Sequence, residues 1–343
     1  LSGDPGIGKS TLLLQIGANS RQKVLYCSGE ESIEQVKLRA ERLSIKKKDV
    51  FLLSSNSLGE VQSAIGIVKP DLVIIDSIQT IASSDLSGTA GSVGQVRECS
   101  SRLIEIAKKN SITMFLIGHV TKEGAIAGPQ VLSHLVDTVL FLEGERFKAI
   151  RILRSLKNRF GPVDEVGVFT FDSSGFADVK NPSELFLPRD KDAVAGSVVA
   201  STVEGTRPIL VEIQALAIPS KLAFPRRVVS GVPLSRVELL CAVLQKQGKL
   251  PLDRFDIFVN VAGGIRLSEP GIDLGICLAI ASSIKNVSLP KTVALAEVGL
   301  LGELRDVSDG QKREKEARKR GFSRVLSARN FKRLDDVLLK VMG

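Results

Sequence analysis

A phosphate-binding loop is the first chemistry that the residue types and their spacing indicate. Gly3-Asp-Pro-Gly-Ile-Gly8-Lys9-Ser10 fits the pattern G-x-x-x-x-G-K-[ST]. Its glycines let backbone N–H groups curl around phosphate oxygens, and the helix expected after them points its positive end at the same place. We expect Lys9 to reach the β- and γ-phosphates of ATP and Ser10 to hold Mg²⁺. The predicted nucleotide contacts are Gly3, Asp4, Pro5, Gly6, Ile7, Gly8, Lys9, Ser10 and Thr11.

Ionisable side chains also follow three predicted strands. Asp76 ends the apolar run Leu-Val-Ile-Ile, where a phosphate-loop enzyme needs a carboxylate for the Mg²⁺ shell. Glu30 follows the strand that ends at Ser28, and we expect it to be the general base, with Glu31 as its support or substitute. Either glutamate could instead favour the N-terminus of the following helix. His119 ends a further strand and is a candidate sensor of the γ-phosphate or a structural histidine.

Two further stretches of the chain contain candidate functional cations. Lys157-Asn-Arg159-Phe-Gly161 could be a solvated turn, but in ring ATPases cations of one subunit complete the neighbour's site. Lys122 lies in a polar stretch bounded by glycine, which is typical of a mobile loop.

The elements that must position these residues indicate an α/β fold. Short apolar runs alternate with amphipathic stretches, which predicts a mainly parallel sheet covered by helices over residues 1–180. The expected strands are 24–28, 50–53, 72–76, 113–118, 138–143 and 150–155, and the expected helices are 9–17, 32–43, 58–68 and 92–109. A hairpin with its turn at 172–175 closes this domain.

The remainder of the chain follows a different pattern. Residues 181–191 contain two prolines and no periodicity, so they are predicted to be a linker. Residues 192–343 are predicted to be an α+β domain. Its expected strands are 196–203, 210–216 and 256–261, and its expected helices are 235–247, 272–284, 308–320 and 335–341.

Composition limits the class of protein. The chain has 343 residues and a net charge of +9, with twelve Lys or Arg against six Asp or Glu after residue 304. This surplus indicates an anionic partner or a solvated helix face, and the lack of Trp favours contact with phosphates over stacking on bases. No apolar run reaches the roughly 18 residues that span a membrane, and the four cysteines form no C-x-x-C pair. A soluble, cytoplasmic protein is therefore expected.

The phosphate loop begins at the third residue, which leaves no room for the strand that must feed it. We therefore expect this sequence to be a fragment of a longer protein.

Taken together, these motifs resemble the RadA (Sms) family of bacterial DNA repair proteins. The resemblance rests on the phosphate loop, Ser28-Gly-Glu-Glu-Ser32, Ile75-Asp-Ser-Ile-Gln-Thr80, Gly118 to Gly124, Val136-Asp-Thr-Val139, Lys157 to Gly161 and Asn181 to Leu187. It implies a RecA-like ATPase core followed by a Lon-protease-like domain of the ribosomal protein S5 domain 2-like class. Zinc is implied only for an N-terminal four-cysteine module that this sequence does not include.

The resemblance further implies a homo-hexamer that hydrolyses ATP and moves along single-stranded DNA. Such a motor would drive branch migration of branched recombination intermediates together with the RecA recombinase. Lys157 and Arg159 would then serve the neighbouring subunit's nucleotide, DNA, or both, and Lys122 would lie on a loop that faces the pore.

In the second domain, the resemblance identifies the positions of a protease's Ser–Lys dyad. The serine position falls on Asp273 and the lysine position on Arg313, with Ser268, Lys312 and Lys315 close enough to be alternatives. Arginine cannot act as the base and aspartate cannot replace the alkoxide, so no peptidase activity is expected.

Without peptidase chemistry, the second domain is expected to be a platform for the ring. Its helix from Lys312 to Arg320 would face duplex DNA through Arg318, Lys319 and Arg320. Two alternatives remain open at this point: an ATP-dependent Lon-like protease, and an ATP-switched assembly protein of the KaiC kind.

Overall fold

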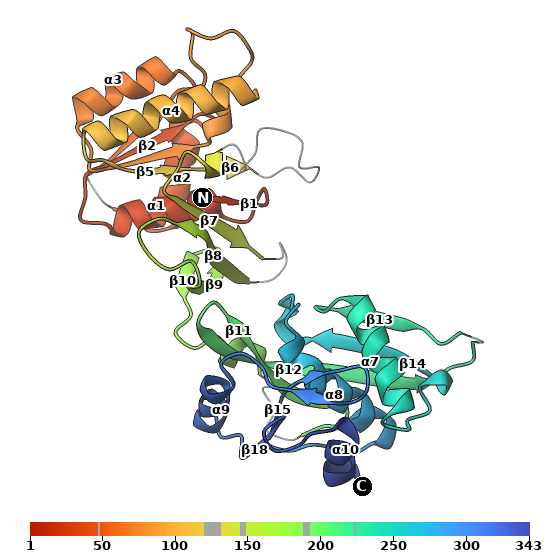
Figure 1. Ribbon diagram of the computed structural model, residues 1–343. Helices are drawn as coiled ribbons and strands as arrows, with labels where there is room; N and C mark the ends of the chain where they lie inside the picture. Colours follow the sequence, from red (N-terminus) through yellow and green to blue (C-terminus); the bar gives the residue numbers. More distant parts are fainter. Residues whose placement is uncertain (47–48, 120–131, 145–148, 188–192, 223) are drawn as a thin grey trace. The chain divides into compact units, whose positions relative to one another are not determined.

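The computed structural model describes residues 1–46, 49–119, 132–144, 149–187, 193–222 and 224–343 (Figure 1). The chain forms two compact units, Leu1–Val179 and Lys180–Gly343. Each unit buries its own set of apolar side chains, so each has an interior of its own. The described residues include no helix with the length and apolar character needed to cross a membrane.

The first unit contains two hydrogen-bonded sheets, ordered β3-β2-β4-β5 and β10-β9-β8-β7-β1-β6. The strands are β1 (Ser2–Gly3), β2 (Val24–Ser28), β3 (Val50–Ser54), β4 (Leu72–Asp76), β5 (Thr113–Leu116), β6 (Gly118–His119), β7 (Thr138–Glu143), β8 (Ile150–Asn158), β9 (Val166–Asp172) and β10 (Gly175–Asp178). The first sheet is parallel, and so are the pairs of β1 with β6 and with β7. The strands from β7 to β10 are antiparallel.

The predicted strand at 113–118 joins these two sheets. Its first part, β5, pairs with β4, and after a break at Ile117 its last part, β6, pairs with β1. β1 has only two residues, yet it lies between β6 and β7. This corrects the expectation that the phosphate loop has no strand of its own in this chain.

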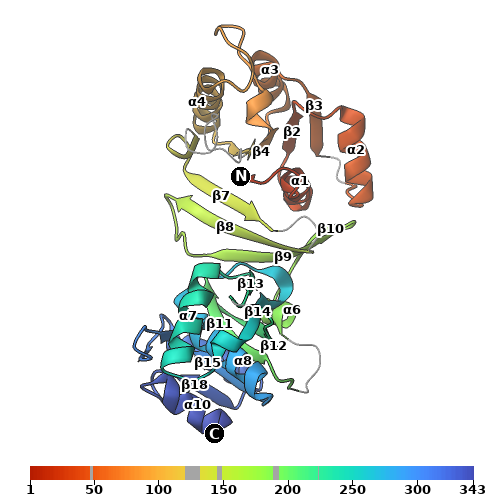
Figure 2. The same cartoon turned by 90° about the vertical axis from the view of Figure 1, so that its right-hand side faces the viewer.

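Helices cover both faces of the parallel strands (Figure 2). Their bounds are α1 (Lys9–Asn19), α2 (Ile33–Arg42), α3 (Leu58–Val68) and α4 (Val93–Lys109). α1 and α2 pack on Tyr26 and Ile74 of one face, whereas α3 and α4 pack on Cys27 and Ile75 of the other. Because neighbouring residues of a strand point to opposite faces, these strands are apolar throughout.

Serine side chains cap the N-termini of α2, α3 and α4. Ser32 forms a capping box with Gln35 at α2, and Ser57 and Ser92 accept hydrogen bonds from N–H groups in the first turns of α3 and α4. Such caps satisfy donors that have no partner within the helix. The helix limits predicted at 58–68 and 92–109 are therefore found within one residue.

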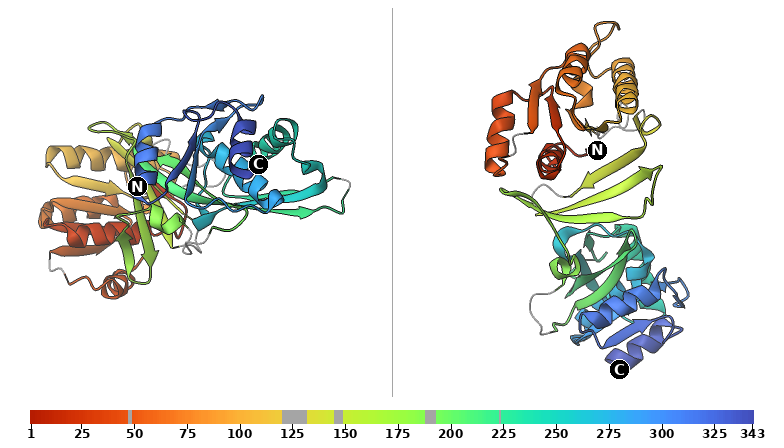
Figure 3. Two further views of the ribbon diagram at one scale, coloured as in Figure 1. Left: turned by 90° about the horizontal axis from the view of Figure 1, so that it is seen from below. Right: turned by 90° about the vertical axis from the view of Figure 1, so that its left-hand side faces the viewer.

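The second unit contains a six-stranded mixed sheet, ordered β13-β14-β12-β11-β15-β18, and a separate β16-β17 hairpin. Its strands and helices are drawn in green to blue in Figure 3. The strands are β11 (Ser197–Glu204), β12 (Arg207–Pro219), β13 (Arg227–Ser230), β14 (Phe255–Val261), β15 (Thr292–Leu295), β16 (Glu297–Val298), β17 (Leu304–Arg305) and β18 (Arg324–Ser327). The helices are α6 (Ser183–Phe186), α7 (Leu234–Lys246), α8 (Asp273–Lys285), α9 (Gly310–Lys319) and α10 (Leu334–Met342).

Both faces of this second sheet are also covered. α8 lies so close to β11 that a Cβ on Gly275 would come within 2.8 Å of the Ala200 side chain. On the opposite face, Ala317 of α9 packs with Val199 and Leu210. The sequence patterns missed β13, β15 and β18, because runs of four residues are too short to display a clear alternation.

In the segment predicted as a linker, 181–191, the described residues 181–187 depart from expectation, and residues 188–191 lie outside the described residues. Its residues 183–186 form α6, and Phe186 is 1% exposed. The N–H of Leu210 on β12 donates to Ser183 Oγ at 3.1 Å, which anchors the segment to the second unit. A four-residue helix is too short to show the 3.6-residue period, and for this reason its composition resembled a linker.

Candidate active site

The carboxyl ends of the parallel strands of the first unit bring the predicted nucleotide residues to one edge. The phosphate loop follows β1, Glu30 follows β2, Ser77 follows β4, and His119 ends β6. Because parallel strands end at the same edge, four segments distant in sequence meet there. Among the candidates, Lys122 lies outside the described residues.

The loop between β1 and α1 requires glycine at specific positions. Gly3, Gly6 and Gly8 have φ values of 149°, 77° and 109°, a region that side-chain-bearing residues rarely adopt. A Cβ on Gly3 would lie 2.2 Å from the Leu142 carbonyl oxygen, and one on Gly8 would lie 2.9 Å from the Phe176 ring. Gly8 is also the N-cap of α1 and has no side chain to cap that helix. The loop backbone thus leaves the helix end to be capped by another group, as an anion-binding loop does.

Lys9 closes over this loop. Its side chain is buried, and Nζ donates to the carbonyl oxygens of Gly3 at 2.8 Å and Asp4 at 3.0 Å. Burial lowers the pKa of Lys9, while the carboxylates of Asp76, Asp4 and Glu30 oppose that shift. A phosphate oxygen could replace these carbonyl contacts and would supply the negative charge that a buried ammonium needs.

Asp76 ends β4 and is 6% exposed. Its Oδ2 accepts a hydrogen bond from the hydroxyl of Tyr26, a residue of the adjacent strand β2. Burial and the nearby carboxylate raise the pKa of Tyr26 far above its usual value, so the phenol remains a donor. Together with the Ser10 hydroxyl at the start of α1, Asp76 offers the oxygen ligands that Mg²⁺ prefers, so these residues fit the ion.

Glu30 lies at the centre of a polar cluster. Ser77 Oγ donates to Glu30 Oε1 at 2.7 Å, and His119 Nε2 lies 3.4 Å from the same oxygen. The Glu30 side chain is 47% exposed, so water can reach it. His119 Nδ1 and Gln79 Oε1 are buried and have no hydrogen-bond partner among the described residues. Ser77 and Gln79 escaped the sequence reasoning because polar residues after a strand are common.

The structure separates the two glutamates that were considered together. Glu31 forms an ion pair with Arg39 of α2, and its backbone N–H donates to Ser28 Oγ at 2.9 Å. The Glu31 side chain therefore lies against α2, away from the Ser77 and His119 contacts of Glu30. This geometry does not support Glu31 as a substitute base; its contacts indicate a role in attaching α2.

A buried arginine behind the phosphate loop also escaped the sequence reasoning. Arg151 on β8 is 2% exposed, its Nε donates to the Ile7 carbonyl oxygen at 3.1 Å, and its guanidinium lies 5.2 Å from the Phe171 ring centre. Burial lowers its pKa. The sequence signal that could have identified this residue is an arginine within the otherwise apolar run 150–153. Its contact supports the loop from behind.

Lys157 and Arg159 lie away from the phosphate loop of their own chain. Gly3 pairs with Leu142 of β7, whereas Lys157 pairs with Val139 of the same strand. Val139 precedes Leu142 by three residues, which is about 10 Å along β7 at 3.3 Å per residue. Lys157 Nζ donates to the carbonyl oxygens of Ser133 at 2.6 Å and Val136 at 2.8 Å. Arg159 forms a 3.0 Å ion pair with Asp137. The structure therefore does not bring these cations to the site that holds Lys9.

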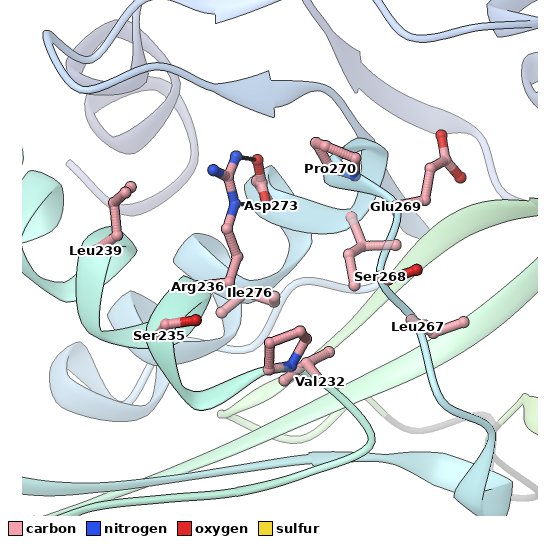
Figure 4. A pocket seen from close by; sticks show the side chains of 12 residues that line it. Val232, Ser235, Arg236, Leu239, Leu267, Ser268, Glu269, Pro270, Asp273 and Ile276 are labelled. Carbon is pink, nitrogen blue, oxygen red and sulfur yellow. Dashed lines mark hydrogen bonds and ion pairs between the residues drawn. The ribbon is translucent and has the colours of Figure 1, made fainter. Parts of the chain in front are cut away.

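The positions compared with a protease dyad carry two ion pairs. Asp273 of α8 is paired with Arg236 of α7, with 2.9 Å between Oδ1 and Nε, and also accepts from the Val298 N–H at 3.2 Å (Figure 4). The hydrogen bond to Asp273 raises the pKa of Arg236. Arg313 is fully buried, is paired with Glu269, and donates to the Ser201 carbonyl oxygen at 2.8 Å. Asp273 and Arg313 thus bind other partners.

A cavity of about 380 Å³ lies beside the first of these ion pairs. In Figure 4, Val232, Leu239 and Ile276 form its apolar wall, and Ser268 lies at its side. No lysine is among the described residues that line it. The alternatives Lys312 and Lys315 are exposed on α9, and Lys312 is paired with Asp309 at 2.7 Å.

The basic end of α9 is largely neutralised by its own helix. Arg318 is paired with Glu314 at 2.8 Å, and Arg320 is paired with Glu316 at 2.7 Å. Arg320 also lies 3.5 Å from Glu184 of α6. These contacts favour a solvated helix face over a surface that contacts DNA. Across the described residues there is no group of three or more His, Cys, Asp or Glu that could hold a metal ion.

Comparison with known proteins gives a consistent set of relatives. A family model described as an AAA domain matches residues 1–125. The DNA repair protein RadA of Halalkalibacterium halodurans is 50% identical over 330 residues, which covers 95% of this chain and 72% of the relative. RadA of Bacillus subtilis has the same identity and coverage, and RadA of Listeria monocytogenes is 48% identical over 96% of this chain and 73% of its own.

Among solved structures, a KaiC-like protein of Pyrococcus horikoshii aligns with 52% of this chain and 87% of its own. Its TM-score is 0.42 and its sequence identity is 17%.

Proposed function

Because this chain belongs to the RadA family of bacterial DNA repair proteins, we propose that it is an ATPase of DNA repair and that Glu30 is its general base. The observation that carries the proposal is the position of Glu30. One of its oxygens accepts from Ser77 and lies near His119, at the strand edge to which the phosphate loop also belongs. A carboxylate that is oriented and still open to water is suited to accept a proton from an attacking water.

The residues around Glu30 would bind the nucleotide and Mg²⁺ and would detect the γ-phosphate. The loop from Gly3 to Gly8 would surround the phosphates, and Lys9 would exchange its carbonyl contacts for oxygens of the β- and γ-phosphates. Ser10 and Asp76 would hold Mg²⁺, which supplies charge neutralisation on the phosphate oxygens. His119, whose Nε2 faces Glu30, would respond to the presence of the γ-phosphate.

Lys157 and Arg159 are proposed to act on a neighbouring copy of the chain. Their position, about 10 Å along β7 from the phosphate loop, argues against a role at their own nucleotide. Phe160 beside them is 85% exposed, as expected of a side chain that a partner covers. In this proposal the copies form a hexameric ring, and the two cations stabilise the charge of the transition state in trans, contact DNA, or do both.

The proposed motor moves along single-stranded DNA and drives branch migration alongside the RecA recombinase. Lys122 is proposed to reach the DNA in the pore. The second unit is proposed to be a Lon-like platform for the ring without peptidase activity, which is supported by the ion pairs of Asp273 and Arg313. Duplex DNA contact through Arg318, Lys319 and Arg320 has weaker support, because two of these cations are already paired.

The ATPase rate with and without single-stranded DNA tests this proposal. We expect DNA to stimulate the wild-type protein, Lys9→Ala to be inactive, and Lys157→Ala to bind ATP normally but to lose stimulation. Mixing inactive Lys9→Ala with Lys157→Ala should restore part of the activity if Lys157 acts in trans. Full stimulated activity of Lys157→Ala would refute its role.

Two measurements separate the alternatives from the motor. ATP-dependent degradation of casein, lost in Ser268→Ala, would indicate a protease. ATP hydrolysis that DNA does not stimulate, without strand displacement, would indicate an assembly switch of the KaiC kind.

A further inference from the structure

The hydroxyl group of Tyr26 contacts the nucleotide site from inside the apolar core. Tyr26 is 1% exposed and packs with Leu13, Leu14 and Val36 beneath α1 and α2. From there its hydroxyl reaches Oδ2 of Asp76. A hydroxyl in such surroundings needs a partner, and a ring packed on all sides cannot follow a carboxylate that rotates.

The register of the sheet explains why this contact is specific. Tyr26 pairs with Ile74 and Ser28 with Asp76, so Tyr26 lies two residues behind Asp76 on the same face of the neighbouring strand. At that diagonal a long aromatic side chain can reach the carboxylate, whereas a phenylalanine would end one atom short. The contact therefore depends on the hydroxyl and not on the ring.

We propose that Tyr26 is a positioning residue of the nucleotide site: its hydroxyl holds Oδ2 of Asp76, so that the carboxylate presents its other oxygen to the water shell of Mg²⁺ in one orientation. This inference rests on the assignment of Asp76 to Mg²⁺ in the proposed function. Partners that orient a metal ligand commonly change metal affinity by about 10- to 100-fold. A contact through a water shell belongs at the lower end of that range.

The composition of the chain provides a direct readout. Tyr26 is the only tyrosine of the 343 residues, and the chain has no tryptophan. Emission from the protein excited in the tyrosine band therefore comes from this one phenol. A hydrogen-bonded carboxylate quenches a phenol, so a change at Asp76 alters the emission without any turnover.

The first experiment titrates Mg²⁺ into the wild-type 343-residue chain with a non-hydrolysable ATP analogue, starting in excess chelator. We expect tyrosine emission to stay constant when the analogue binds without Mg²⁺ and to rise as Mg²⁺ enters. Lys9→Ala with the same additions controls for absorption by the nucleotide. If tyrosine emission does not change with Mg²⁺ while a fluorescent nucleotide shows Mg²⁺-dependent binding, the proposal is overturned.

The second experiment compares Tyr26→Phe with Cys27→Ala, which removes one buried atom of the same strand on the opposite face. For Tyr26→Phe, the Mg²⁺ concentration at half-saturation of nucleotide binding should rise about tenfold, with binding in chelator unchanged. Cys27→Ala should leave both values at the wild-type level. A Tyr26→Phe curve that overlays the wild type overturns the proposal, and if this variant does not fold, the emission experiment decides alone.

Asp76→Asn separates this inference from the proposed function. If nucleotide binding by Asp76→Asn has the wild-type dependence on Mg²⁺, then the assignment of Asp76 to the ion is wrong. If Asp76→Asn is impaired and Tyr26→Phe is normal, the role of Tyr26 alone is refuted.

Discussion

The proposed nucleotide site of the first unit and the ion pairs of the second unit contain similar charged residues, but the partners of these residues differ. In the first unit, Lys9 donates to carbonyls of its own loop, and the side chain of Glu30 is 47% exposed. In the second unit, Asp273 and Arg313 are fully buried, and each binds an oppositely charged side chain.

The difference shows how a site for a ligand can be told from an ionic part of a core. A phosphate can displace the carbonyl contacts of Lys9 at small cost, because a charge replaces a dipole. Nothing can displace Arg236 from Asp273 without leaving a buried charge unpaired. The replaceable contacts of Lys9 therefore indicate a binding function, whereas the ion pair of Asp273 with Arg236 indicates a structural role.

The largest expected effect is on hydrolysis in Glu30→Gln. An amide cannot accept a proton from water, so the rate of ATP cleavage should fall by about 10²- to 10⁴-fold with ATP binding unchanged. Single-turnover release of phosphate measures this. Glu31→Gln is the matched control, because Glu31 is paired with Arg39, and its rate should stay within about tenfold of the wild type. Equal losses in the two variants would break the distinction between the glutamates.

The next effect is on folding, in Asp273→Ala. This change leaves Arg236 without its partner, and the free energy of unfolding should fall by about 3 kcal/mol, the lower end for buried pairs because Arg236 keeps some contact with water. Urea denaturation measures it. Replacing both residues, Arg236→Met with Asp273→Leu, should recover most of the loss. If Asp273→Ala is as stable as the wild type, the ion pair is not a structural element.

In the first unit, Lys9→Met is expected to lower activity without lowering stability. Hydrolysis should fall by about 10²- to 10³-fold, whereas the stability of the ligand-free protein should not fall. Burial lowers the pKa of Lys9, so the folded state disfavours the charged form. The resulting destabilisation of the folded protein is fully present at pH values below the pKa that Lys9 has in the folded state. It disappears as the pH rises towards the ordinary lysine value of 10.5.

Thermal unfolding of Lys9→Met and wild type at several pH values checks this expectation. Any advantage of the variant should be present at neutral pH and shrink in alkali. A loss of stability as large as that of Asp273→Ala would show that Lys9 is a structural cation like Arg236.

The smallest effect is expected on the surface of α9. Arg318→Ala removes an exposed pair with Glu314 and should lower the free energy of unfolding by about 0.3–0.5 kcal/mol, less at high salt. Arg320→Ala should cost more, because Arg320 is less exposed and also contacts Glu184 of α6. Denaturation at low and high salt compares them, and equal costs would contradict the role of Arg320 in holding α6.

The sequence predicted the elements of the first unit well where a pattern was long enough to show its period. The strands at 24–28 and 72–76 and the helix at 58–68 have the predicted bounds. In the second unit, β13, β15 and β18 are four residues each and went unrecognised. The short helix α6 was taken for a linker for the same reason.

The phosphate loop of the candidate site could be predicted from the sequence, whereas the side-chain contacts of the two glutamates could not. The phosphate loop follows from its own residues, because glycine conformation and a helix start are local properties. That Glu30 faces Ser77 while Glu31 faces Arg39 is not a local property. Adjacent residues of one turn point to different neighbours: Ser77 directly follows β4, and Arg39 lies in α2.

By itself, the sequence determined the family, the parallel α/β core and the residues that could bind a nucleotide, since these depend on residue type and on spacing within one segment. Only the tertiary structure decided which side chains meet: Tyr26 with Asp76, Arg151 with the phosphate loop, and Arg313 with Glu269. These contacts join segments 44 to 144 residues apart. Their partners are chosen by sheet order, register and burial, which act only once the chain has folded.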